Sequence, residues 1–267
     1  MKLMTINTHS YAEGEIDANL DVFVNAIKDL DPDIVAIQEV NQLRTAKSVK
    51  NNDLIAWQSG IELKEDNFGL CAVSKLNDLG LNYKLVWLGI KHGYVIFDEG
   101  IAFLVKNDVS STYAYALSET EDTDNWRKRM ALVVKSQNMW FCNVHMGRWD
   151  DEKEPFKNQW QKLKNYTCNK SPMWIMGDFN IPADKRNEGY DLILSDGWHD
   201  TYTMAQDKDD GYTVKGSIDG WKDTEDICQR IDYIFADKKT DITSSYTVFN
   251  GKNKEVISDH YGIIIEF

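Results

Sequence analysis

The sequence predicts an α/β (α+β) fold, and three observations support this prediction. The chain has 267 residues, of which 42% are hydrophobic, and this size and composition are typical of one large α/β or β-rich domain. Short apolar segments of strand length recur along the chain, and amphipathic helical segments separate some of them. No internal repeat or Pro/Gly/Ser-rich linker divides the sequence, so we expect a single domain over residues 1–267.

The apolar segments predicted to form strands share a short length and several end next to a polar residue. They are residues 3–7, 34–38, 69–74, 85–88, 101–105, 132–136, 140–145, 173–178, 231–236 and 262–267.

Helical spacing of apolar residues predicts the helices. Spacings of three and four residues run from Leu20 to Leu30, and Asp31-Pro32 ends this segment. A second helix is predicted over residues 151–166, and a third, shorter one over residues 190–194 that ends near Gly197. Residues 205–225 are polar and contain glycine, so we expect a long surface loop there.

The net charge of −13 bears on the type of partner. Proteins that bind nucleic acid neutralise phosphates with clustered Lys and Arg, whereas the average field of this chain repels polyanions. A small phosphorylated substrate, attracted by a bound cation, fits this charge better. The N-terminal segment lacks the apolar stretch of a signal peptide, and no segment has about 18 consecutive apolar residues. We therefore expect a cytoplasmic protein with no membrane partner.

Polar residues of catalytic type stand at the ends of four predicted strands. Asn7, His145 and Asp178 close their strands, and Glu39 directly follows another. Strand ends are rigid supports, and neighbouring strands that end on one side of a sheet gather their terminal side chains into one site. The sequence therefore predicts a functional site at this edge.

Asp178 and Asn180 are two residues apart beyond an apolar strand, so an extended backbone would direct both side chains to the same side. A carboxylate can bind a hard cation or position water, and an amide can donate a hydrogen bond to a phosphate oxygen. The alternative is a turn, because turns use Asp and Asn often.

Asp232 lies within an otherwise apolar strand, where a buried carboxylate is costly unless it is paired. It could form a structural salt bridge with Arg230 or another cation, or it could orient a histidine, as in many hydrolytic sites. His260, which follows Asp259 shortly before the last strand, supplies such a histidine. Asp-His pairs also occur for purely structural reasons.

Glu39 is placed to hold Mg²⁺, which prefers oxygen ligands. Taken alone, it could equally cap the loop that follows its strand. His145, likewise, could be a core histidine.

Together these motifs resemble the endonuclease/exonuclease/phosphatase superfamily over the whole chain, Met1–Phe267. The motifs, in sequence order, are Asn7, Gln38-Glu39, Asn143-Val144-His145, Gly177-Asp178-Phe179-Asn180, Arg230-Ile231-Asp232-Tyr233 and Ser258-Asp259-His260. The resemblance implies a four-layer sandwich of two packed mixed β-sheets flanked by helices. It also implies a metal-dependent phosphoesterase.

The resemblance assigns a role to each matching residue. Glu39 is expected to be the main ligand of Mg²⁺, with Mn²⁺ as an alternative, and Asn7 and Asp259 are expected near the metal. Asp178 would position or activate the attacking water. Asn180 and His145 would bind the phosphoryl oxygens, and His260, oriented by Asp232, would stand at the scissile phosphate. Whether Asp178 or His260 takes the proton stays open.

The superfamily includes nucleases, inositol polyphosphate phosphatases, sphingomyelinases and sugar phosphatases, so the shared motifs do not select a substrate. Its abasic-site endonucleases carry tyrosine where this chain has His145, which argues against that branch. Secreted sphingomyelinases carry a signal peptide and an exposed apolar hairpin, and we expect neither here.

The substrate expected here is a small sugar phosphate. Of the 9 tryptophans, Trp149, Trp198 and Trp221 fall in loop-like segments, and an aromatic face suits the apolar face of a sugar ring. We expect Arg148 and Trp149 to contact the substrate. Residues 4–10, 38–42 and 98–102 resemble the cytoplasmic maltose 6′-phosphate phosphatases of Gram-positive bacteria.

Two alternatives remain at this stage. A DNA or RNA phosphodiesterase of the same fold would carry a basic stripe near its site, which residues 126–129 could supply. A non-catalytic binding module should have lost at least one of Glu39, Asp178, Asp232 or His260, whereas all four are present.

Overall fold

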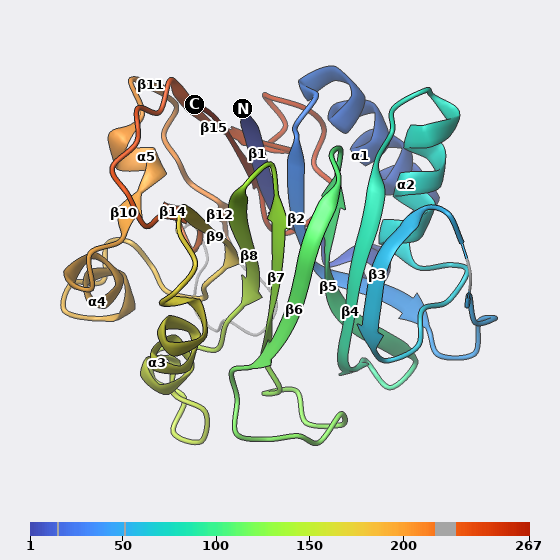
Figure 1. The fold of residues 1–267 in the computed structure, drawn as a ribbon, viewed down its shortest axis with the longest axis horizontal. Coiled ribbons are helices and arrows are strands. Elements are labelled where there is room, and N and C mark those ends of the chain that lie inside the picture. The colour runs from blue at the N-terminus through green and yellow to red at the C-terminus, as the bar shows by residue number, and fades with distance from the viewer. Residues whose placement is uncertain (15, 51, 217–227) are drawn as a thin grey trace.

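Two large mixed sheets pack face to face in the computed structural model, which describes residues 1–14, 16–50, 52–216 and 228–267 (Figure 1). The first sheet has eight strands. In spatial order they are β11 (Asp207–Lys208), β15 (Ser244–Val248), β16 (Gly262–Glu266), β1 (Lys2–Asn7), β2 (Ile34–Leu43), β5 (Phe97–Val105), β4 (Lys84–Gly93) and β3 (Ile55–Gly60).

The second sheet has six strands. In spatial order they are β10 (His199–Asp200), β14 (Asp232–Ala236), β9 (Met173–Asp178), β8 (Met139–His145), β7 (Met130–Ser136) and β6 (Val109–Ala116). A small separate ribbon pairs β12 (Val214–Lys215) with β13 (Cys228–Gln229). Both large sheets combine parallel and antiparallel pairs, for example β1 with β2 and β1 with β16 in the first.

Alternating side chains of each strand enter two different cores, as expected for strands buried on both faces. In β1, Leu3 packs between the sheets, whereas Met4 packs toward the helices. Phe141 and Met176 of the second sheet join Leu3 in the core between the sheets.

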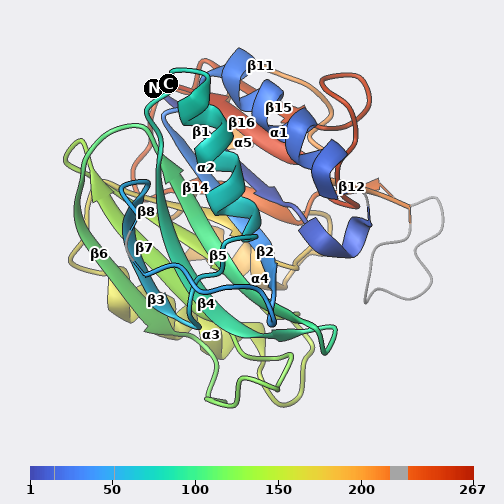
Figure 2. The same cartoon turned by 90° about the vertical axis from the view of Figure 1, so that its right-hand side faces the viewer.

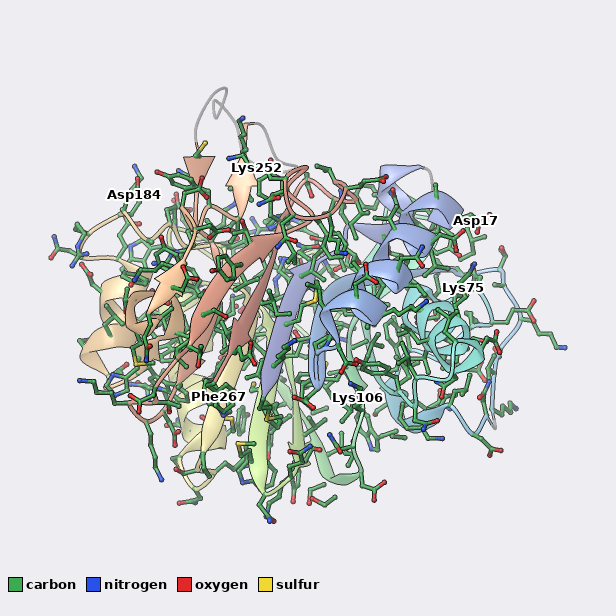
Figure 3. The ribbon with its side chains drawn as sticks, turned by 90° about the horizontal axis from the view of Figure 1, so that it is seen from above. Asp17, Lys75, Lys106, Asp184, Lys252 and Phe267 are labelled. Carbon is green, nitrogen blue, oxygen red and sulfur yellow. The ribbon has the colours of Figure 1, made fainter. Side chains whose placement is uncertain are left out.

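Helices cover the outer face of each sheet. Helices α1 (Ile16–Leu30) and α2 (Phe68–Asp78) lie side by side on the first sheet (Figure 2), where their apolar faces share a core with β1 and β2. An ion pair of 2.7 Å between Lys75 and Asp21 joins them at the surface; Figure 3 labels Lys75 on α2. Helices α3 (Phe156–Thr167) and α4 (Gly189–Ser195) cover the second sheet. The predicted four-layer α/β sandwich is therefore confirmed.

The remaining helical turns are η1 (Ser10–Glu13) and α5 (Thr201–Met204). Among the described residues, none of the helices is both long and apolar enough to cross a membrane.

One predicted strand is wrong: residues 69–74 belong to helix α2. A short apolar run does not distinguish a strand from a buried helical segment. The distinguishing signal is Asn67, whose side chain accepts a hydrogen bond from the backbone N of Leu70 at 3.2 Å and caps the helix.

Two further segments differ from expectation. The predicted loop at 205–225 contains the short strands β11 and β12, and its part from residue 217 onward lies outside the described residues. The turn between β4 and β5 does expose apolar side chains, since Tyr94, Val95 and Ile96 are 51%, 83% and 56% exposed. The expectation that the chain has no exposed apolar hairpin was therefore wrong.

Candidate functional site

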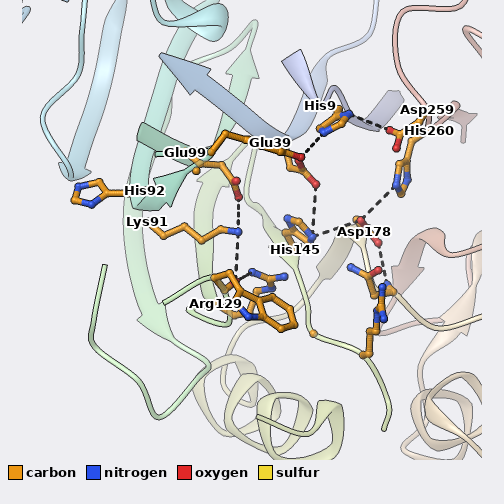
Figure 4. Close-up of a pocket in the computed structure, with 16 residues that line it drawn as sticks. His9, Glu39, Lys91, His92, Glu99, Arg129, His145, Asp178, Asp259 and His260 are labelled. Atoms are coloured by element: carbon orange, nitrogen blue, oxygen red, sulfur yellow. Dashed lines mark hydrogen bonds and ion pairs between the residues drawn. The ribbon is translucent and has the colours of Figure 1, made fainter. Parts of the chain in front are cut away.

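A pocket of about 300 Å³ opens where the strand ends of the two sheets meet (Figure 4). Parallel pairing brings the ends together, because Asn7 of β1 is in register with Gln38 of β2, and His145 of β8 with Asp178 of β9. Most of the predicted site residues line this pocket. They are Glu39, His145, Asp178, Asn180, Arg148, Asp259 and His260.

Asn7 and Asp232 do not line the pocket, but each hydrogen-bonds to side chains that do. The Asn7 amide donates to Oε1 of Glu39 at 2.9 Å and to Oδ2 of Asp178 at 3.1 Å. Asp232 is fully buried at the start of β14, and its carboxylate lies 3.0 Å from Nδ1 of His260. The hypothesis that Asp232 orients a histidine therefore matches the geometry, whereas Arg230 forms its ion pair with Asp200 at 2.7 Å.

A β-bulge directs Glu39 into the pocket. The pairing of β2 with β5 is regular up to Ile37 and resumes at Val40 with a shifted register. Glu39 itself has a φ of 49°, a conformation that non-glycine residues rarely adopt. Bulges of this kind re-aim a side chain and are common beside active sites.

Gly177 allows the close approach of β9 to β8. Its φ is 142°, and a Cβ at this position would lie 2.0 Å from the carbonyl oxygen of Val144. Only glycine fits there, so it fixes the register that places Asp178 opposite His145.

The environment of Glu39 suits a cation. Burial raises the pKa of Glu39 and the nearby Glu99 raises it further, while His9 and Lys91 offset part of this effect. A buried carboxylate beside a second acid is stabilised by a bound divalent ion, which prefers oxygen ligands. Asp259 also lines the pocket, whereas the side-chain oxygen of Asn7 accepts a hydrogen bond from the backbone N of His9 at 3.1 Å.

Asp178, Asp232 and His260 form a second group whose ligand atoms lie within 4.8 Å of one another. Both carboxylate oxygens of Asp232 already lie within hydrogen-bond distance of Nδ1 of His260, at 3.2 and 3.0 Å. Nε2 of His260, on the other side of the ring, lies 3.9 Å from Oδ2 of Asp178. The described residues therefore offer two candidate places for a cation, this group and the surroundings of Glu39.

The pKa values of the two catalytic-type histidines are shifted in opposite directions. For His260, burial lowers the pKa, but the carboxylates of Asp232 and Asp178 outweigh burial and raise it well above the usual value. For His145, burial lowers the pKa well below the usual value, and the charges of Arg129 and Lys91 lower it further. These shifts favour the charged form of His260 and the neutral form of His145.

Asp178 has a pKa raised to about 7, first by burial and then by the charge of Asp232. Hydrogen bonds from the backbone N of Asn180 (2.9 Å) and from Asn7 lower it in part. A general base works best with a pKa near the working pH, so Asp178 is suited to accept a proton.

The predicted tryptophans lie elsewhere. Trp149 packs against Phe156, with ring centroids 6.3 Å apart, and is not among the described residues that line the pocket. Trp198 packs against Trp160 at 5.9 Å, and Trp221 lies outside the described residues. Arg148 does line the pocket, so only one of the two predicted substrate contacts faces it.

Sequence reasoning missed the other wall of the pocket. It is formed by residues of the β4–β5 hairpin and of the segment before β7, notably Lys91, Tyr94, Glu99, Trp126 and Arg129. The available signal was the charged residues Lys91 and Glu99 in two largely apolar strands. Arg129 is 6% exposed, and its Nε has no hydrogen-bond partner among the described residues.

The chain is similar to known proteins over its full length. A model of the Endonuclease/Exonuclease/phosphatase family matches residues 4–260. An endonuclease/exonuclease/phosphatase family protein from Leptotrichia buccalis is 30% identical, with a TM-score of 0.86 over 100% of this chain and 98% of that chain. No curated protein matches the sequence.

Two more distant structures share the fold. A mannosyl-6-phosphatase from Bacteroides thetaiotaomicron is 17% identical, with a TM-score of 0.64 over 100% of this chain and 98% of that one. A 3′-5′ exonuclease from Neisseria meningitidis is 18% identical, with a TM-score of 0.66 over 100% and 99%. Members of the matching family are phosphoesterases and nucleases that generally use a divalent metal. This chain belongs to the endonuclease/exonuclease/phosphatase family.

Proposed function

We propose that the protein is a metal-dependent phosphomonoesterase that acts on a small sugar phosphate, such as maltose 6′-phosphate. The observation that carries this proposal is the pocket that Glu39, Asp178 and His260 line together, with Asp232 bonded to His260. Its volume of about 300 Å³ suits a small ligand.

In this proposal Glu39 is the main ligand of Mg²⁺, with Asn7 and Asp259 close by and Mn²⁺ as an alternative. The bound cation would polarise a phosphoryl oxygen and offset the negative charge that develops during the reaction. The buried, partly uncompensated charge of the Glu39 carboxylate supports this assignment.

The protein side chains divide the remaining work. Asp178 positions the attacking water and accepts its proton as the oxygen attacks phosphorus. The bond to the sugar oxygen breaks, and this oxygen takes a proton from solvent water and leaves as the alcohol. His260, held by Asp232, donates a hydrogen bond to the phosphoryl group, and His145 and Asn180 orient its oxygens. The pKa of Asp178, raised to about 7, favours Asp178 as the base over His260, whose pKa the carboxylates of Asp232 and Asp178 raise well above its usual value.

Charge near the pocket favours a sugar phosphate over nucleic acid. Arg127 is paired with Asp151 at 2.7 Å, and Lys91 with Glu99 at 3.0 Å. Lys128 donates to the backbone of Glu121, and Arg129 is buried. The candidate basic stripe at residues 126–129 is therefore largely neutralised or buried. The shared fold of the mannosyl-6-phosphatase also agrees with this choice.

A DNA or RNA phosphodiesterase remains the second candidate, because the Neisseria meningitidis exonuclease has the same fold. The experiment is phosphate release from a panel of sugar phosphates, with Mg²⁺ or with a chelator, beside nicking of plasmid and single-stranded DNA by the same preparation. We expect Mg²⁺-dependent release from a sugar phosphate and intact DNA. Nicked DNA with inert sugar phosphates would overturn the substrate proposal.

A further inference from the structure

The wall of the pocket opposite Asp178 and His260 carries polar groups that influence Glu39 and His145 through their charge but have no assigned contact with the phosphate. Figure 4 shows Lys91 and Glu99 facing one another on this side, above Arg129. We infer that Lys91, Glu99 and Trp126 bind the sugar ring of the substrate and select for it. This inference rests on the proposed sugar phosphatase function.

The ion pair between Lys91 and Glu99 is the first support. The two residues are paired across β4 and β5, their charged atoms lie 3.0 Å apart, and their side chains are only 11% and 8% exposed. Removing two charges from water is costly, and apolar replacements of such buried pairs are often neutral or stabilising. A role in binding accounts for the presence of this costly pair in the pocket wall.

The spare hydrogen-bonding capacity of the pair matches adjacent hydroxyl groups. Lys91 has three N–H donors, which reach Oε1 of Glu99 and, at 3.4 Å, the carbonyl oxygen of Trp126. Oε2 of Glu99 lies against Gly93, where a Cβ would come within 3.1 Å of it. A donor and an acceptor fixed side by side fit a vicinal diol, in which one hydroxyl donates to Glu99 and its neighbour accepts from Lys91.

Trp126 supplies an aromatic surface at the edge of the same wall. It lines the pocket although it is 53% exposed. Its carbonyl oxygen accepts hydrogen bonds from Lys91 and from Arg129 (2.8 Å), and the guanidinium of Arg127 lies 4.2 Å from the ring centroid. An indole fixed beside charged hydrogen-bonding groups suits a sugar ring, which has an apolar C–H face and a polar edge.

The test compares two phosphomonoesters that share the phosphate but differ in the leaving group. kcat/KM is measured for maltose 6′-phosphate and for p-nitrophenyl phosphate, which has no sugar hydroxyls. For Trp126→Ala and Glu99→Gln we expect the ratio of the two kcat/KM values to fall about 10- to 100-fold, mainly through KM for the sugar phosphate. Trp126→Ala removes an exposed side chain and leaves the buried Lys91–Glu99 pair intact, so this variant should fold even if Glu99→Gln does not.

Matched controls are Tyr113→Ala, which removes another exposed aromatic ring, and Lys75→Met, which breaks an exposed ion pair. Both should leave the ratio at the wild-type value. A second readout is inhibition of p-nitrophenyl phosphate hydrolysis by unphosphorylated maltose, which should weaken in Trp126→Ala.

The outcomes separate the two claims. An unchanged ratio in both Trp126→Ala and Glu99→Gln, with sugar phosphates still hydrolysed, overturns the assignment of this wall and leaves the sugar phosphatase function standing. A wild-type protein that releases phosphate from p-nitrophenyl phosphate but from no sugar phosphate overturns the proposed function and the inference together.

Discussion

Asn7 connects the two sheets through the active-site carboxylates: its side-chain amide lies 3.1 Å from Oδ2 of Asp178 and 2.9 Å from Oε1 of Glu39. Asn7 ends β1 in the first sheet, and Asp178 ends β9 in the second. One amide group therefore fixes the distance between the proposed cation side of the pocket and the proposed general base.

Asn7→Ala should disturb the base as well as the geometry. The hydrogen bond from Asn7 lowers the pKa of Asp178, so its loss should move the lower limb of the kcat/KM pH profile to higher pH. We also expect kcat to fall by about 10- to 100-fold. Asn165→Ala, which changes an exposed asparagine on α3, is the control. An unshifted pH profile would contradict the role of Asn7.

Asp232→Asn removes a charge that raises the pKa of His260. The pKa of His260 should fall, and turnover should drop by about 100- to 1,000-fold, because a hydrogen-bond donor aimed at the developing charge is weakened. NMR titration of the His260 ring measures the first effect, and steady-state kinetics the second. Asp29→Asn, at an exposed ion pair with Lys254, serves for comparison. Near-normal turnover with a lowered His260 pKa would show that the cationic form is not needed.

Glu39→Gln should abolish the stabilisation that Mg²⁺ gives to the folded protein. Binding to the native state alone raises stability by mass action, so the wild-type Tm should rise by about 5 °C or more at Mg²⁺ about 100 times above Kd. Thermal unfolding at increasing Mg²⁺ concentration measures this, with the exposed Glu62→Gln as the control. An equal rise in Glu39→Gln would place the cation elsewhere, such as among Asp178, Asp232 and His260.

Asp178→Asn should stabilise the metal-free protein at high pH. The folded pKa of Asp178, about 7, lies above the unfolded value of 3.8. Between pH 3.8 and about 7, the carboxyl group of Asp178 is ionised in the unfolded chain but still protonated in the folded protein. The free energy of unfolding of the wild type therefore falls as the pH rises through this range, and the loss persists above it.

The variant lacks this loss, so at pH 8 its free energy of unfolding should exceed that of the wild type by about 1–3 kcal/mol, and it should unfold at a higher denaturant concentration. At pH 4 the two free energies of unfolding should be nearly equal. The measurement is urea unfolding in the presence of a chelator. A gain that is larger at pH 4 than at pH 8 would contradict the raised pKa.

The sequence predicted the catalytic half of the pocket better than its other half. Asn7, His145 and Asp178 end apolar segments whose strand character is clear, and parallel pairing then brings the ends together. Lys91 and Glu99 meet only because β4 and β5 pair across a register shift, which local periodicity does not reveal.

Other features depend on backbone conformations that residue type does not signal. Glu39 reaches the pocket through a bulge at a positive φ, which is unusual for glutamate. Trp126 and Trp149 both follow loop-like sequence, yet only Trp126 lines the pocket, because Trp149 is packed against Phe156. Tertiary packing therefore determines which of these two tryptophans reaches the pocket.

The most direct test of the central claim is Mg²⁺-dependent phosphate release from maltose 6′-phosphate by the wild type and by Asp178→Asn, measured side by side. The account predicts release by the wild type that stops with a chelator and falls by at least about 100-fold in the variant. No release by the wild type, or equal release by both proteins, would contradict it.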